Sequence, residues 1–140
     1  RGSLFGMTRG TNRSHIVRAV LEGIAHRGTD LMEAAEIDSG LAITSVRIDG
    51  GMSKNPTFVQ ALANASQRNI EVSPVTEATT LGAAFLAGVA TGTWKSLSEA
   101  VSTWIPAQVV TPTAALDRGQ WTQAVNRAAG WIPELSALDF

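Results

Sequence analysis

The residues best suited to chemistry lie where a strand is followed directly by two glycines and then by the start of a helix. It reads Arg-Ile-Asp-Gly-Gly-Met-Ser-Lys-Asn-Pro over residues 47–56. Because glycine has no Cβ, Gly50 and Gly51 let a ligand approach the backbone closely. Asn55 suits an N-cap and Pro56 the first helical position, so a helix begins here and offers free N–H groups to an anion. The pattern predicts a nucleotide-binding loop at the carboxyl end of a strand.

A tight turn without a ligand explains the same two glycines equally well. Neither the G-x-G-x-x-G spacing of dinucleotide-binding folds nor the Walker spacing is present. A dinucleotide-binding domain also needs an acidic residue about 20 positions after the loop, and Glu71 lies near there, but the third glycine is missing. Lys54 is either a phosphate contact or a solvated lysine. Asp49 either contacts a metal or a ribose, or caps the turn.

The other ionisable residues form no recognisable catalytic or metal-binding set. His15 and His26 lie too far apart along a helix to share a metal. We expect His15 to be a polar first-turn residue and His26 to lie on the surface. The acids Asp38, Asp49 and Glu77 are isolated in the sequence, so no pair is expected to act as acid and base.

These residues need a scaffold, and the spacing of apolar residues predicts an α/β one. We expect helices over residues 13–37, from 56 on, 76–89, 96–101 and 116–129, and strands over 43–49, 70–72 and a short stretch at 3–5. Residues 104–113 contain two prolines and are expected to be irregular. The alternation of strands and helices between residues 43 and 89 indicates parallel strands.

Small residues within two helical stretches predict close packing. In the helix over 76–89 they favour packing on the sheet, and the alternative is that its N-terminal end lies near the glycine loop. Gly23 and Gly28 inside the first helix each cost about 1 kcal/mol relative to alanine, which indicates a packing role such as close approach to a sheet. A sheet of two or three short strands leaves its edges and faces uncovered. We infer the end piece of a larger α/β domain, or a chain that pairs tightly with another.

Composition excludes several classes of protein. The 140 residues are 44% hydrophobic and 16% charged, which is too apolar for a disordered chain. Lys and Arg total 11 against 12 Asp and Glu, and this balance gives no reason to expect a nucleic-acid partner. There are no cysteines, which excludes disulfides and thiol catalysis and fits a cytoplasmic location. No apolar run approaches the roughly 20 residues of a membrane helix, so no membrane partner is expected.

Three ordered motifs resemble the FGGY family of carbohydrate kinases. Residues 2–7 (Gly-x-Leu-x-Gly-Met) followed by 15–22 (His-Ile-x-x-Ala-Val-Leu-Glu) are similar to the family's C-terminal signature. Residues 47–52 (Arg-Ile-Asp-Gly-Gly-Met) with Asn55 are similar to its adenosine-site loop. Residues 77–84 (Glu-Ala-Thr-Thr-Leu-Gly-Ala-Ala) resemble the helix that follows, in the form that glycerol kinases carry.

The resemblance implies an actin-like, ribonuclease-H-like fold in two domains. ATP would bind in the cleft, and its γ-phosphate would pass to a polyol or sugar hydroxyl with Mg²⁺. Gly51 and Asn55 match the loop positions that contact the nucleotide in this family, and Gly50 is their neighbour in the turn. The family's catalytic aspartate, sugar contacts and main phosphate loops lie in parts absent here. The resemblance therefore implies no catalytic residue and no metal ligand in this chain.

We accordingly expect residues 1–140 to be the C-terminal portion of the kinase's C-terminal domain, without the N-terminal domain. This would be an incomplete ribonuclease-H-like domain, with few strands and helices packed on them, inactive alone. The motifs are most similar to those of glycerol kinases, which implies conversion of glycerol to glycerol 3-phosphate. The alternatives are another FGGY kinase, for xylulose or gluconate, and a non-catalytic self-association module. Expected partners are ATP, a small polyol or sugar and the rest of the kinase chain, with a homo-oligomer as a further option.

Overall fold

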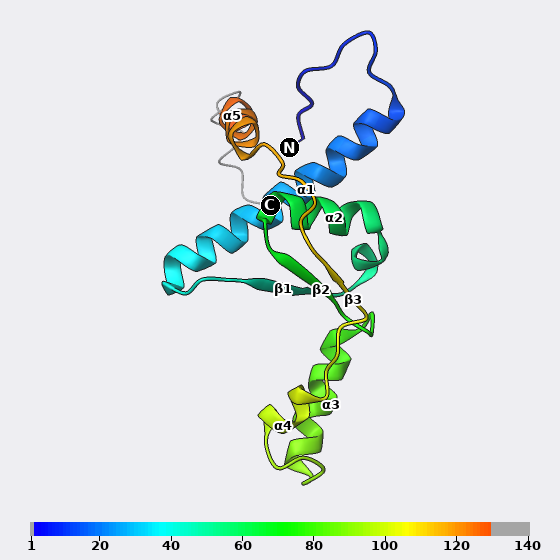
Figure 1. The fold of residues 1–140 in the computed structure, drawn as a ribbon, viewed down its shortest axis with the longest axis vertical. Coiled ribbons are helices and arrows are strands. Elements are labelled where there is room, and N and C mark those ends of the chain that lie inside the picture. The colour runs from blue at the N-terminus through cyan, green and yellow to red at the C-terminus, as the bar shows by residue number, and fades with distance from the viewer. Residues whose placement is uncertain (1, 130–140) are drawn as a thin grey trace.

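The structure, a computed structural model, describes residues 2–129 and divides into a layered body and a projecting arm. The body contains α1 (Arg13–Ser39), β1 (Ser45–Ile48), the 3₁₀ helix η1 (Gly51–Lys54), α2 (Pro56–Ser66), β2 (Asn69–Val72) and β3 (Gln108–Val110). The arm consists of α3 (Ala78–Ala90) and α4 (Leu97–Ser102), and it extends away from the sheet (Figure 1). A last helix, α5 (Arg118–Ala129), returns to lie beside α1.

The sequence sets both ends of α1. The Asn12 side chain accepts hydrogen bonds from the backbone N–H groups of Ser14 and His15, and His15 Nδ1 accepts one from the Asn12 N–H at 3.2 Å. This reciprocal pairing satisfies backbone donors that a helix start leaves free. Gly40, with φ of +69°, ends the helix in the left-handed conformation. The expected helix and the first-turn role of His15 are both confirmed.

The sheet contains three strands in the order β1-β2-β3. β1 and β2 are parallel, as the alternation of strands and helices predicted, and Ile48 lies opposite Val72. β3 runs antiparallel to β2 and places Val110 opposite Ile70. The prediction that residues 104–113 are irregular was therefore wrong in its middle. Three residues are too few to show a period of two, and the pairing partner is far away in the sequence.

The core lies between the sheet and the two helices α1 and α2. Its buried residues are Ala25, Val59, Ala61, Leu62, Ala63, Ala65 and Ile70. A Cβ at Gly28 would lie 3.2 Å from Leu62 Cδ1, so this glycine lets α1 and α2 approach closely. The expected packing role of Gly28 is thus confirmed, but its neighbour is a helix and not the sheet.

The structure corrects three further predictions. α3 packs against α4 and not on the sheet, and none of the residues described within it is buried. Its small residues permit close packing but do not specify a partner. His26 is buried, with 9% of its surface exposed, because Trp121 of α5 stacks on its ring. Residues 3–5, for which a short strand was expected, carry no strand in the described chain.

Candidate functional site

The glycine turn follows β1 directly and is tight. Gly50 has φ of +78°, which side chains with a Cβ rarely adopt, and Gly51 begins η1. Ser53 closes the turn, since its Oγ donates to the Gly50 carbonyl at 2.7 Å and its N–H to the same oxygen at 3.2 Å. A Cβ built on either glycine meets no atom of the described chain within 4 Å. Packing within this chain therefore does not explain why residue 51 is a glycine.

Asn55 links the turn to α2. Its Oδ1 accepts hydrogen bonds from the N–H groups of Thr57 and Phe58 at 3.1 and 3.2 Å, and Pro56 takes the first helical position as expected. Its own N–H donates to the carbonyl of Met52. Within residues 2–129 its side-chain NH₂ group makes no hydrogen bond, so it remains a donor for a ligand. The structure thus brings Gly50, Gly51 and Asn55 together on one turn.

Asp49 connects the turn to the arm. Its Oδ2 accepts a hydrogen bond of 3.2 Å from the backbone N–H of Ala78, the first residue of α3. The N-terminal end of α3 therefore lies beside the glycine turn, which is the arrangement given above as the alternative to sheet packing. Two helix starts, those of α2 and α3, then lie near the carboxyl end of β1, where open α/β sheets bind ligands.

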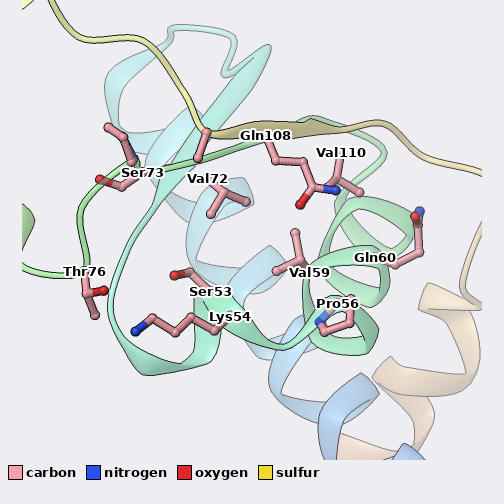
Figure 2. Close-up of a pocket in the computed structure, with 12 residues that line it drawn as sticks. Ser53, Lys54, Pro56, Val59, Gln60, Val72, Ser73, Thr76, Gln108 and Val110 are labelled. Carbon is pink, nitrogen blue, oxygen red and sulfur yellow. The ribbon is translucent and has the colours of Figure 1, made fainter.

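A cavity of about 360 Å³ opens next to the turn. Figure 2 shows Lys54 extending toward Thr76 across one side, and Val59 and Val72 lining the other. The cavity is lined by Ser53, Lys54, Pro56, Val59, Gln60, Val72, Ser73, Pro74, Thr76, Ala107, Gln108 and Val110. The three predicted nucleotide contacts, Gly50, Gly51 and Asn55, border it without lining it.

Several of the cavity's polar residues are absent from the sequence predictions. Ser73 and Thr76 follow β2, and Gln108 comes from β3, the strand that the sequence did not reveal. Ser73-Pro74 signals only the end of a strand, so no local pattern distinguishes these residues as site candidates.

The described residues show neither a metal cluster nor a membrane helix. Within residues 2–129, no three His, Asp or Glu side chains come together in a group that could hold a metal ion. No helix in the same range combines the length and the apolar character needed to cross a membrane.

Comparison with known proteins gives one consistent family. The FGGY family of carbohydrate kinases, C-terminal domain, matches residues 1–91. The chain is 42% identical to a glycerol kinase of Clostridium beijerinckii over 139 residues, which cover 96% of this chain and 28% of the relative. It is 41% identical to a glycerol kinase of Dechloromonas aromatica over 136 residues, covering 94% of this chain and 27% of the relative.

Solved structures agree with the sequence relatives. The Plasmodium falciparum glycerol kinase with ADP matches with a TM-score of 0.76 and 36% identity, covering 99% of this chain and 27% of that one. A ligand-bound xylulose kinase from Lactobacillus acidophilus matches with a TM-score of 0.78 and 26% identity, covering 96% of this chain and 29% of that one. The chain therefore spans little more than a quarter of the length of the proteins it matches.

Proposed function

Because this chain belongs to the FGGY family of carbohydrate kinases, we propose that it forms the adenosine side of the nucleotide site in an ATP-dependent kinase. The kinase transfers the γ-phosphate of ATP to a polyol or sugar hydroxyl. Glycerol is the proposed acceptor, with glycerol 3-phosphate as product, because the relatives named above at about 40% identity are glycerol kinases. Xylulose and gluconate are the alternative acceptors, since kinases for both sugars share the fold.

The observation that carries this proposal is the open glycine turn at the end of β1. Gly50 and Gly51 present backbone with no side chain over it, and the space beside them is free of other described atoms. Asn55 adds a side-chain amide donor on the same turn. Backbone and amide donors next to helix starts suit the polar groups of a nucleotide. One of the similar structures is a glycerol kinase with ADP, which supports a nucleotide as the ligand.

The described residues of this chain do not fit Mg²⁺, the metal that the resemblance implies. Mg²⁺ prefers carboxylate and phosphate oxygens in an octahedral arrangement. Asp49, the acid nearest the glycine turn, has one carboxylate oxygen engaged by the Ala78 N–H, and no acidic cluster lies within residues 2–129. We therefore assign no metal ligand within residues 2–129.

The proposed fragment character explains apolar surface that the described chain leaves uncovered. Val17, Val20, Ile24 and Leu31 follow one another at helical spacing on α1, and each has 46–67% of its surface exposed. Exposed apolar stripes of this kind mark interaction surfaces. We propose that the rest of the kinase chain, including the N-terminal domain, covers them and supplies the catalytic and sugar-binding groups. The chain alone would then transfer no phosphate.

The same stripe supports a second candidate, a non-catalytic module that associates with itself. Sedimentation of the chain with and without an ATP analogue separates the two. A monomer that binds the analogue weakly fits the kinase piece, whereas a tight dimer that ignores nucleotide fits the module.

Replacing Gly51 by valine in the full-length kinase tests the proposed site. The β-branched side chain would fill the space beside the turn, and we expect ATP affinity, measured by calorimetry, to fall by at least about tenfold, or roughly 1.4 kcal/mol. Ala115→Val, at an exposed loop position before α5, is the matched control. Unchanged ATP affinity in a folded Gly51→Val protein would refute the site, and glycerol-dependent ADP formation by this chain alone would refute the fragment assignment.

A further inference from the structure

We propose that Asp49 is a positioning residue, which anchors the start of α3 to the glycine turn and so fixes the turn for nucleotide binding. This inference rests on the proposed function. The inference extends the proposed function by assigning a role to the acidic residue beside the two glycines.

The geometry places Asp49 where a helix cap is needed. The first N–H groups of a helix have no partner within the helix. Glu77, the residue that precedes α3, makes no capping hydrogen bond with its side chain. The Asp49 carboxylate accepts from the first of these donors, at Ala78, across 29 positions of sequence. Its negative charge also lies at the positive end of the helix dipole.

Few other contacts join the arm to the body in the described chain. Backbone hydrogen bonds continue past the ends of the strands. The Ser73 N–H donates to the Ile48 carbonyl and the Ala107 N–H to the Val72 carbonyl, both at 2.9 Å. The Arg47 guanidinium lies 4.1 Å from the ring centre of Trp104, close to where the chain returns from α4. Asp49 is thus the side chain next to the glycines that contacts the arm directly.

The hydrogen bond gives the turn a second fixed end. On one side Asn55 holds the turn to α2, and on the other Asp49 holds it to α3, while Ser53 closes the turn itself. A ligand that binds to backbone groups gains affinity when those groups are already in place. Loss of the Asp49 contact would let the turn and the arm move independently, and nucleotide binding would then have to order them.

Two substitutions separate positioning from direct ligand binding. Asp49→Ala removes the acceptor, whereas Asp49→Asn keeps an acceptor oxygen of the same shape without the charge. In the full-length kinase we expect Asp49→Ala to raise the KM for ATP about fivefold, the effect of one lost hydrogen bond, with kcat unchanged. Asp49→Asn should stay within about twofold of the wild type. Asp38→Ala, which removes an exposed acid from α1, is the control for charge.

Hydrogen exchange without nucleotide supplies an independent readout. The amides of residues 78–81 should exchange faster in Asp49→Ala than in Asp49→Asn. If Asn is as damaging as Ala, the acceptor oxygen at position 49 is not what fixes the turn, and the inference fails. Unchanged exchange and an unchanged KM in Asp49→Ala also overturn it. Failure of the proposed nucleotide site appears separately, as normal ATP affinity in Gly51→Val.

Discussion

The helices α2 and α3 are of similar length and both rich in apolar residues, yet they differ sharply in what they bury. Six residues of α2 are buried between α1 and the sheet, namely Val59, Ala61, Leu62, Ala63, Ala65 and Ser66. None of the described residues of α3 is buried, although apart from Thr79 and Thr80 they are all apolar or glycine. A helix that is apolar on all sides is normally buried. The body thus contains its own core, whereas we expect the arm to be covered by residues outside 2–129.

Within the arm α3 packs against α4, where Ala100 is fully buried, and α3 also contacts the turn that follows it. Phe85 and Trp94 meet edge to face, with ring centres 5.6 Å apart. A Cβ at Gly88 would clash with the Trp94 ring, so this glycine lets the tryptophan lie against α3. These contacts fix α3 against the turn that follows it, but they leave Leu86 with 62% of its surface exposed.

Helix α5 is attached in a third way, by charge and stacking. The Arg118 guanidinium bridges Asp30 and Glu33 of α1, at 2.6 and 2.7 Å. Trp121 Nε1 donates to both oxygens of Asp30, and its ring stacks on His26 with centres 5.1 Å apart. The difference from α2 is that this attachment depends on ionisable groups, so it should respond to pH.

The largest expected effect tests whether buried side chains stabilise the body of this chain more than side chains of the arm do. Ile70 is fully buried in the sheet, and Ile70→Ala should lower the free energy of unfolding by about 2–5 kcal/mol. Leu86→Ala in the arm should cost less than about 0.5 kcal/mol in this chain, where the side chain is exposed. Denaturant unfolding measures both.

The same pair of variants in the full-length kinase sharpens the comparison. There we expect Leu86→Ala to cost several times more than in the isolated chain, because the rest of the kinase would cover the arm. An equally small cost in both proteins would show that this part of the arm stays exposed, and the proposed cover would be wrong.

A smaller effect is expected at the attachment of α5. Asp30→Ala removes the shared acceptor of Arg118 and Trp121, and hydrogen bonds to a charged group contribute roughly 1.5–3 kcal/mol. We expect destabilisation at the lower end of this range, because the pair is partly exposed, and faster amide exchange over α5. Arg18→Ala breaks an exposed pair with Glu22 on α1 and should cost less than about 0.5 kcal/mol. Equal costs for the two variants would mean that the Asp30 contacts do not hold α5.

The sequence correctly predicted those structural features that depend on one short segment. Asn12 and Gly40 define the ends of α1, and Asn55 with Pro56 defines the start of α2, because capping depends on neighbours a few residues away. The α/β class and actin-like fold are confirmed by the matching kinase structures. The glycine turn lies where the sequence placed it, and its role in binding stays a prediction.

Features that depend on distant partners were not predictable in the same way. His26 is contacted by Arg118, 92 positions away in the sequence, and by Trp121 of the same helix, and nothing near His26 in the sequence indicates that α5 will cover it. β3 is recognisable as a strand only through its pairing with β2. For α3, the small residues predicted packing on the sheet, but small residues permit close packing without specifying a partner, and the helix packs against α4.

The smallest expected effect concerns the pH dependence of the α5 attachment. Burial, together with the positive charge of Arg118, lowers the pKa of His26 below its ordinary value of 6.5, and this outweighs the opposing effect of Glu22, Asp30 and Asp117. The folded state therefore favours neutral His26. Its stabilisation is complete above pH 6.5 and decreases as the pH falls toward the lower, folded pKa.

A second group in the same cluster titrates in a lower range, which makes the His26 effect separable. Burial raises the pKa of Asp30, but hydrogen bonds from Arg118, Trp121 and Arg27 lower it by more, so the net pKa lies below 3.8 and its contribution is lost only in stronger acid. Protection factors of the α5 amides, which correct for the intrinsic pH dependence of exchange, should therefore decrease as the pH falls below 6.5 because of His26. His26→Phe keeps an aromatic ring against Trp121 and removes the titration, so the protection factors of its α5 amides should change little over the same pH range. If both proteins show the same pH response, the attachment of α5 does not depend on the ionisation of His26. The attachment of α5 would then differ from the packing of α2 in geometry and not in its dependence on this ionisable group.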